Sequence, residues 1–139
     1  MLYSLGVLYD FKRQHFERDN PGQMFPAYVT LNESACKAVR DRVSPFASMK
    51  QAITIASGLD EADIPIEPAL TAAGVHPGLD ILFSLDGYDT LMRMGRDDFF
   101  SHFYHLWYPV SDDMCLCDDS AEWVVFVSHI GEMYLMRAP

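Results

Sequence analysis

Four side chains of metal-binding type stand close together in the chain: His102, His105, Cys115 and Cys117. On a helix over residues 98–107 the two histidines share one face, because they are three positions apart. Two cysteines two positions apart on a strand point to the same side of it. If these two sides met, the four groups could bind a zinc ion. The alternative, which we favour, places the histidines at a polar rim and the cysteines in the core, with no bound metal and no cofactor.

Adjacent carboxylates could supply acid–base chemistry, and the chain has three such pairs: Asp97-Asp98, Asp112-Asp113 and Asp118-Asp119. All three fall at predicted element ends, where an aspartate more often caps a helix or forms a turn. The chain has no Gly-x-Ser-x-Gly elbow, and Cys36 stands in a predicted helix beside no assignable histidine. We therefore predict that the protein is not an enzyme.

The charge of the chain is strongly asymmetric. The formal net charge is −10, and residues 97–136 contain eight carboxylates and no Lys or Arg. A nucleic-acid binder needs clustered cationic side chains, so this composition disfavours that class. Carboxylates without cationic partners are expected in water or against a basic partner, because burying them unpaired is costly. A solvated surface and a docking surface for a basic protein both fit this pattern.

The strongest strand signal lies in residues 122–128, which combine β-branched and aromatic residues. Residues 114–117 and 133–136 flank it, and turn-forming residues separate the three segments. We predict an antiparallel meander. His129, in the second turn, is interpreted first as a surface residue, then as an orienting hydrogen-bond partner, and last as a site residue.

Helical spacing or helix boundary signals occur in six segments, which we predict as helices: residues 32–43, 44–57, 68–73, 79–85, 88–94 and 98–107. Thr30 and Glu33 have the spacing of a capping box for the first of them. Asp86-Gly87 could instead make a hairpin of the fourth and fifth. The first 17 residues fit a strand and a helix equally. The string Asp60-Glu-Ala-Asp63 matches a helicase signature, but without a phosphate-binding loop the match is chance.

Length and composition indicate a single domain over residues 1–139, because half of the residues are hydrophobic. The predicted fold is α+β, with helices in the first two thirds packed on the C-terminal antiparallel meander. The chain has no apolar run near the roughly 20 residues that span a bilayer. It also has no basic leader and an odd number of cysteines, three. These features predict a cytoplasmic protein with reduced thiols.

Residues 111–134 resemble the C-terminal sheet of small bacterial immunity proteins, with Trp123 in a strand and Ser128-His129 near its end. Proteins of this kind neutralise polymorphic or contact-dependent toxins, often basic nucleases. The resemblance implies a stoichiometric toxin inhibitor. Together with the acidic second half, it predicts contacts to a basic partner through six residues: Tyr108, Asp112, Asp113, Asp118, Asp119 and Glu122.

Overall fold

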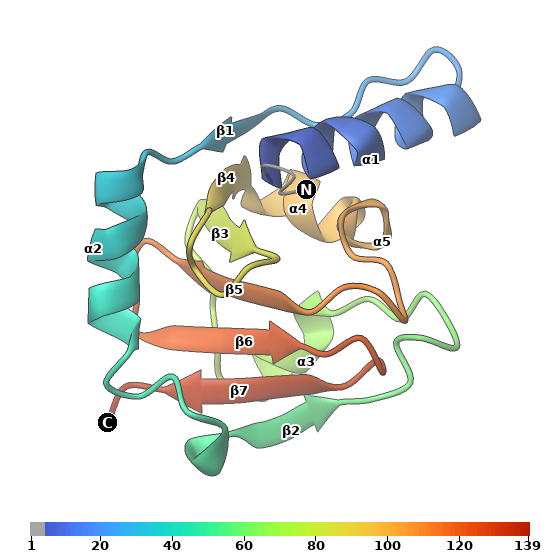
Figure 1. Ribbon diagram of the computed structural model, residues 1–139. Coiled ribbons are helices and arrows are strands. Elements are labelled where there is room, and N and C mark those ends of the chain that lie inside the picture. Colours follow the sequence, from blue (N-terminus) through green and yellow to red (C-terminus); the bar gives the residue numbers. More distant parts are fainter. Residues whose placement is uncertain (1–4) are drawn as a thin grey trace.

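A seven-stranded antiparallel sheet organises the protein, whose computed structural model describes residues 5–139 (Figure 1). The helices are α1 (Leu5–Asp19), α2 (Glu33–Val43), α3 (Glu67–Ala72), α4 (Arg96–Ser101) and α5 (Phe103–Leu106), with a 3₁₀ turn η1 (Met49–Gln51). The strands are β1 (Tyr28–Thr30), β2 (Ile53–Ala56), β3 (Asp80–Ser84), β4 (Met92–Gly95), β5 (Met114–Asp118), β6 (Trp123–Val127) and β7 (Met133–Arg137). No helix within residues 5–139 is both long enough and apolar enough to cross a membrane.

The strand order is β1-β4-β3-β5-β6-β7-β2, so the predicted meander β5-β6-β7 forms one half of the sheet. The other strands come from earlier in the chain, and two of them form the edges of the sheet: β1 beside β4 and β2 beside β7. Leu116 lies opposite Val125, which in turn lies opposite Leu135. Because side chains alternate across a strand, this register places the three on one face.

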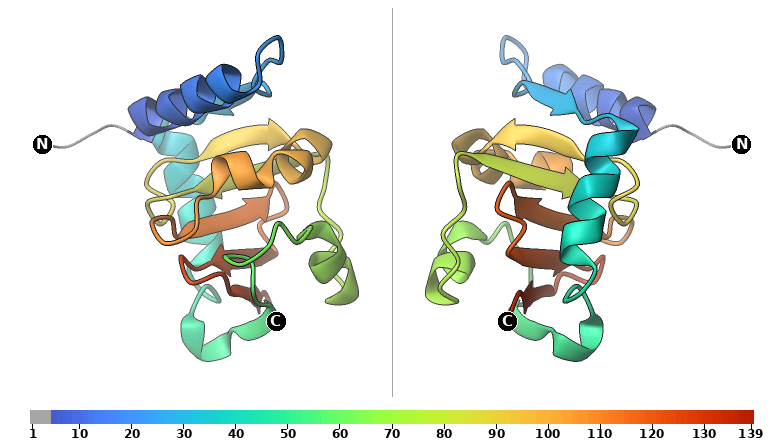
Figure 2. Two further views of the ribbon diagram at one scale, coloured as in Figure 1. Left: turned by 90° about the vertical axis from the view of Figure 1, so that its right-hand side faces the viewer. Right: turned by 90° about the vertical axis from the view of Figure 1, so that its left-hand side faces the viewer.

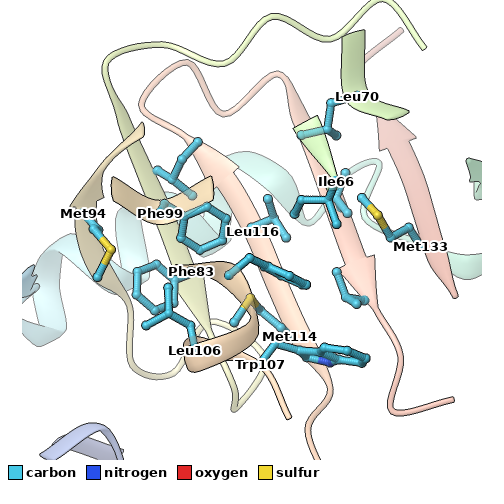
Figure 3. Close-up of a cluster of buried hydrophobic side chains, with 14 of the residues drawn as sticks. Ile66, Leu70, Phe83, Met94, Phe99, Leu106, Trp107, Met114, Leu116 and Met133 are labelled. Carbon is cyan, nitrogen blue, oxygen red and sulfur yellow. The ribbon is translucent and has the colours of Figure 1, made fainter. Parts of the chain in front are cut away.

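That face carries the larger core. Side chains from α1, α3, α4 and α5 pack against it, and Figure 3 shows Phe83, Phe99, Leu116 and Trp107 meeting there. The stacked rings of Phe103 and Trp107 lie 5.6 Å apart. Burial of these large side chains, at roughly 1.5–3 kcal/mol each, is the main force that holds the four helices on the sheet.

The opposite face carries a second core, to which α2 contributes Cys36 and Val43. Asn32 is the N-cap of α2, and its side chain accepts a hydrogen bond of 2.8 Å from the Ala35 N–H. The predicted capping box, with Thr30 as N-cap, is therefore wrong by two residues, because Thr30 belongs to β1. α2 crosses this face near one end of the strands and leaves β5, β6 and β7 in view beside it (Figures 1 and 2).

The mixed α and β composition, the meander and the helices α2 and α3 confirm the sequence prediction in outline. The prediction of two helices over residues 79–85 and 88–94 is wrong, since β3 and β4 pair there as a hairpin. β3 is buried on both faces, so its apolar residues are consecutive and do not alternate with polar ones as they do in a half-exposed strand.

The predicted helix over residues 44–57 is also wrong. The chain turns after α2, passes through η1 and becomes the edge strand β2. The predicted helix over residues 98–107 is interrupted at His102, which separates α4 from α5. The ambiguous N-terminal segment is the helix α1 from Leu5 onward, and its first four residues lie outside the described part of the chain.

Candidate functional site

The six residues predicted to contact a partner lie at the two opposite ends of β5. Three precede the strand and three are in or after its last residue, in the order Tyr108, Asp112, Asp113, then Asp118, Asp119, Glu122. A strand of five residues spans roughly 16 Å, so the two groups do not form one compact site.

Asp112 is largely buried and has partners within the protein. Its carboxylate accepts a hydrogen bond of 2.6 Å from Lys12 Nζ and one of 2.8 Å from the Tyr108 N–H. Lys12 Nζ also lies 3.4 Å from the centre of the Tyr108 ring, a cation–π contact. Burial lowers the pKa of Lys12, while the Asp112 carboxylate opposes that shift. These contacts fix α1 to the segment after α5.

Asp118 is buried as well, and its carboxylate accepts hydrogen bonds from the Gly78 N–H at 3.0 Å and from the Ser120 N–H at 3.0 Å. Asp119 is exposed and pairs with Arg93 at 2.5 Å. Asp113 accepts hydrogen bonds from the His129 N–H at 2.7 Å and contacts the ring Nδ1 at 2.9 Å. His129 is therefore an exposed turn residue that also forms hydrogen bonds to Asp113, which agrees with the first two of its three predicted roles.

Two of the five carboxylates in this set have a Lys or Arg partner from a distant part of the chain: Asp112 pairs with Lys12 of α1 and Asp119 with Arg93 of β4. Within the described residues Asp118 and Glu122 make no ion pair, and of these two Glu122 is exposed. The expectation that the carboxylates of residues 97–136 lie in water or against a basic partner is wrong for Asp112, which is largely buried against Lys12.

The four residues considered as zinc ligands do not meet. His102 and His105 lie beside Phe16 of α1, on the face of the larger core. Cys117 belongs to the second core and Cys115 packs against it, on the opposite face of the sheet. In residues 5–139 no three His, Cys, Asp or Glu side chains gather in a way that could hold a metal ion. The zinc hypothesis is thereby excluded for this set.

A groove of about 790 Å³ lies where the segment before α3 faces α4 and α5. We call it the acidic groove and define it by six of its residues: Asp63, Glu67, Asp97, Phe100, Tyr104 and His105. The Tyr104 hydroxyl donates a hydrogen bond of 2.6 Å to the Ile64 carbonyl, which ties α5 to the opposite wall. Three carboxylates and two aromatic rings, Phe100 and Tyr104, thus line the groove.

The electrostatics of the acidic groove follow from its carboxylates. The pKa of His105 is lowered by burial and by the neighbouring His102, with Asp63 opposing the shift, so the ring is neutral at pH 7. Burial raises the pKa of Tyr104 to about 12. Within residues 5–139 the three acids make one ion pair, between Asp97 and Arg96 at 3.4 Å. The groove is therefore suited to receive positive charge.

Sequence reasoning missed this groove. Asp63 belongs to the string Asp60-Glu-Ala-Asp63, which we interpreted as a chance match. Glu67 and Asp97 are 30 residues apart in the sequence, and the fold brings them to the same groove. A usable signal was the density of acids and prolines in residues 60–68.

Comparisons with protein-family models, with curated proteins and with solved structures find no match to this chain.

Proposed function

We propose that this protein is an acidic binding module for a basic protein, and that it acts as an immunity protein in the cytoplasm, neutralising a basic bacterial toxin by stoichiometric binding. The observation that carries the proposal is the acidic groove, which is lined by three carboxylates and by the rings of Phe100 and Tyr104. A Lys or Arg side chain of the partner fits such a groove, because its charge pairs with the carboxylates and its stem packs on Phe100 and Tyr104.

The charge of the whole chain supports the same partner. At a formal net charge of −10 the protein attracts a basic protein over distances of the order of the Debye length, about 8 Å at physiological salt. Asp113, Asp119 and Glu122, predicted from the sequence as contacts, are exposed and flank the meander as additional negative charge. Asp112, Asp118 and Tyr108 contribute by holding the surrounding backbone in place.

The proposal is tested with the basic C-terminal domain of a secreted protein encoded beside the gene for this chain. We expect a complex of one to one stoichiometry and an association rate that falls steeply with salt. The variant Asp63→Asn/Glu67→Gln/Asp97→Asn is expected to associate at least 10-fold more slowly at 50 mM NaCl, with a flatter salt dependence, measured by stopped flow.

A matched control separates the groove from total charge. Glu33→Gln/Asp41→Asn/Asp89→Asn removes the same three charges from α2 and its surroundings, on the other face of the sheet. This control is expected to slow association by less than three-fold. Equal effects of the two variants, or the absence of any encoded basic neighbour that binds, would contradict the proposal.

A further inference from the structure

The face of the sheet that carries the second core is only partly covered. Among the described helices α2 alone contributes to that core, and β5, β6 and β7 stay in view beside it in Figure 1. On this open area Phe126 and Tyr134 are half-buried and stack at 6.3 Å between ring centres. Half-buried aromatic pairs of this kind are typical anchors at protein interfaces.

A hollow of about 140 Å³ opens in the same area. We call it the sheet hollow; its wall includes Ala47, Met49, Tyr88, Cys115, Phe126 and Met136. Apolar cavities of about this size bind one benzene ring, whereas cofactor and drug sites need roughly 300 Å³ or more. The sheet hollow therefore fits one side chain of Leu, Met or Phe size, and its methionines can adapt to the shape of the guest.

Tyr88 forms a buried part of the wall of the sheet hollow. The residue is 9% exposed, and its hydroxyl lies against the thiol of Cys115, out of reach of solvent. Its backbone has a φ of +79°, held by a hydrogen bond of 3.2 Å from its N–H to Ser84 Oγ.

Cys115 forms the wall next to that hydroxyl. Burial raises the pKa of its thiol to about 11, with Tyr88 opposing the shift and the charges of Asp113 and Asp86 adding to it. The thiol is thus protonated at pH 7, which excludes a thiolate nucleophile here. It acts as a small polarisable surface against an apolar guest.

Two carboxylates stand within electrostatic range of the sheet hollow. Asp86 accepts hydrogen bonds from Ser84 Oγ at 2.6 Å and from the Thr90 N–H at 2.9 Å, and Asp113 contacts His129. Within residues 5–139 neither makes an ion pair with Lys or Arg, and both are exposed. A guest with a cation beside its apolar side chain complements this rim, whereas a second copy of this acidic chain does not.

We infer that the sheet hollow is a docking site for a protein segment that inserts one Leu, Met or Phe side chain flanked by Lys or Arg. The guest's cation faces Asp86 and Asp113, the two exposed carboxylates beside the hollow. The site lies on the opposite face of the sheet from the acidic groove and does not depend on the proposed toxin partner.

The probes are end-blocked hexapeptides with a central Leu between two Arg, compared with peptides in which Ser replaces Leu or Glu replaces Arg. Methionine methyl signals report the binding by NMR. At millimolar peptide we expect the Arg-Leu-Arg peptide to shift the signals of Met49 and Met136 and to leave Met24, which is 87% exposed, unchanged. The Ser and Glu peptides are expected to shift none of them.

Two variants and a control test the geometry. Ala47→Leu fills the sheet hollow and is expected to weaken the Arg-Leu-Arg peptide at least 10-fold, whereas Ala38→Leu, the same change at an exposed position of α2, leaves binding unchanged. Asp86→Asn/Asp113→Asn removes the two exposed charges beside the hollow, so it is expected to weaken the Arg-Leu-Arg peptide several-fold.

The inference is overturned by equal shifts from the Leu and Ser peptides, by no shift at millimolar concentration, or by undiminished binding in Ala47→Leu. If Ala47→Leu does not fold, unchanged binding in Asp86→Asn/Asp113→Asn is decisive against the inference. Methyl shifts that grow with protein concentration alone, with a dimer seen by ultracentrifugation, would identify a second copy as the occupant and also overturn it.

Discussion

At the scale of single residues, the pair Lys12–Asp112 has the largest expected effect on stability. Both side chains are largely buried, at 2% and 11% exposure, and their charged atoms lie 2.6 Å apart. Removing one partner of a buried pair leaves an uncompensated charge, which typically costs about 3–5 kcal/mol. We expect Asp112→Ala to lower the free energy of unfolding by that amount, measured by urea denaturation.

The matched control is Asp19→Ala, which breaks the exposed pair with Arg18 and is expected to cost less than about 1 kcal/mol. The double variant Lys12→Met/Asp112→Asn is expected to recover part of the loss, because no lone charge remains buried. Similar losses for Asp112→Ala and Asp19→Ala would show that the buried pair contributes little. The sequence could not indicate this pair, since its members stand 100 residues apart.

The two cysteines of β5 predict a loss of stability at alkaline pH. Burial raises the pKa of Cys115 to about 11 and that of Cys117 to about 12, from an ordinary 9.0. Above pH 9 the unfolded thiols release protons that the folded thiols retain, so the free energy of unfolding falls as pH rises. The slope approaches about 1.4 kcal/mol per pH unit for each thiol.

This pH dependence is measured by urea denaturation between pH 8 and pH 10, below the range where Tyr9 and Tyr88 add to it. The variant Cys115→Ala/Cys117→Ala is expected to be less stable at pH 8 and to show a flatter slope. A slope as steep as that of the unmodified protein would mean that other groups carry the alkaline loss.

At the scale of elements, the turn between β6 and β7 supports a wall of the acidic groove. Gly131 has a φ of +85°, and its carbonyl accepts a hydrogen bond of 3.1 Å from the Leu59 N–H. A Cβ at this glycine would lie 2.6 Å from the Asp60 backbone nitrogen, far inside contact distance. Gly131→Ala must therefore push away the segment that leads to Asp63.

Gly22 provides the matched control, with the same φ of +85° and no atom within 4 Å of an added Cβ. We expect Gly22→Ala to cost about 1–2 kcal/mol from backbone conformation alone. Gly131→Ala is expected to cost about 1–3 kcal/mol more, because of the steric overlap, measured by urea denaturation. Equal losses would mean that the Asp60 segment moves aside freely.

The elements predicted correctly are those whose signal is local. The meander follows from β-branched and aromatic residues with turn residues between them, and α2 follows from its helical spacing. The hairpin β3-β4 was taken for helices because β3 is apolar on both faces and its neighbours are good helix formers. β2 was missed because its strand identity depends on pairing with β7, some 80 residues away.

The candidate site was harder to predict than the fold, because it too depends on contacts between segments that are far apart in the sequence. The sequence indicated an acidic surface, but the acidic groove needs the segment before α3 to face α4 and α5, and the sheet hollow needs residues 47–49 to lie over β5 and β7. Both arise from contacts between distant segments, which composition and spacing do not encode.

At the scale of the whole molecule, the formal net charge of −10 sets a repulsion that opposes the compact state. The Debye length falls from about 30 Å at 10 mM salt to about 8 Å at 150 mM. Repulsion between distant carboxylates is therefore screened, while close contacts such as Lys12–Asp112 at 2.6 Å are hardly affected. We expect the melting temperature to rise by several degrees between these two NaCl concentrations, measured by calorimetry.

The groove variant Asp63→Asn/Glu67→Gln/Asp97→Asn tests whether repulsion is the cause. It raises the net charge by three, so its melting temperature is expected to be higher at 10 mM NaCl and to rise less with added salt. A melting temperature that falls with salt would mean that surface pairs such as Arg93–Asp119 outweigh the repulsion. The negative charge would then be locally compensated, and long-range attraction of a basic partner would be weaker than the net charge implies.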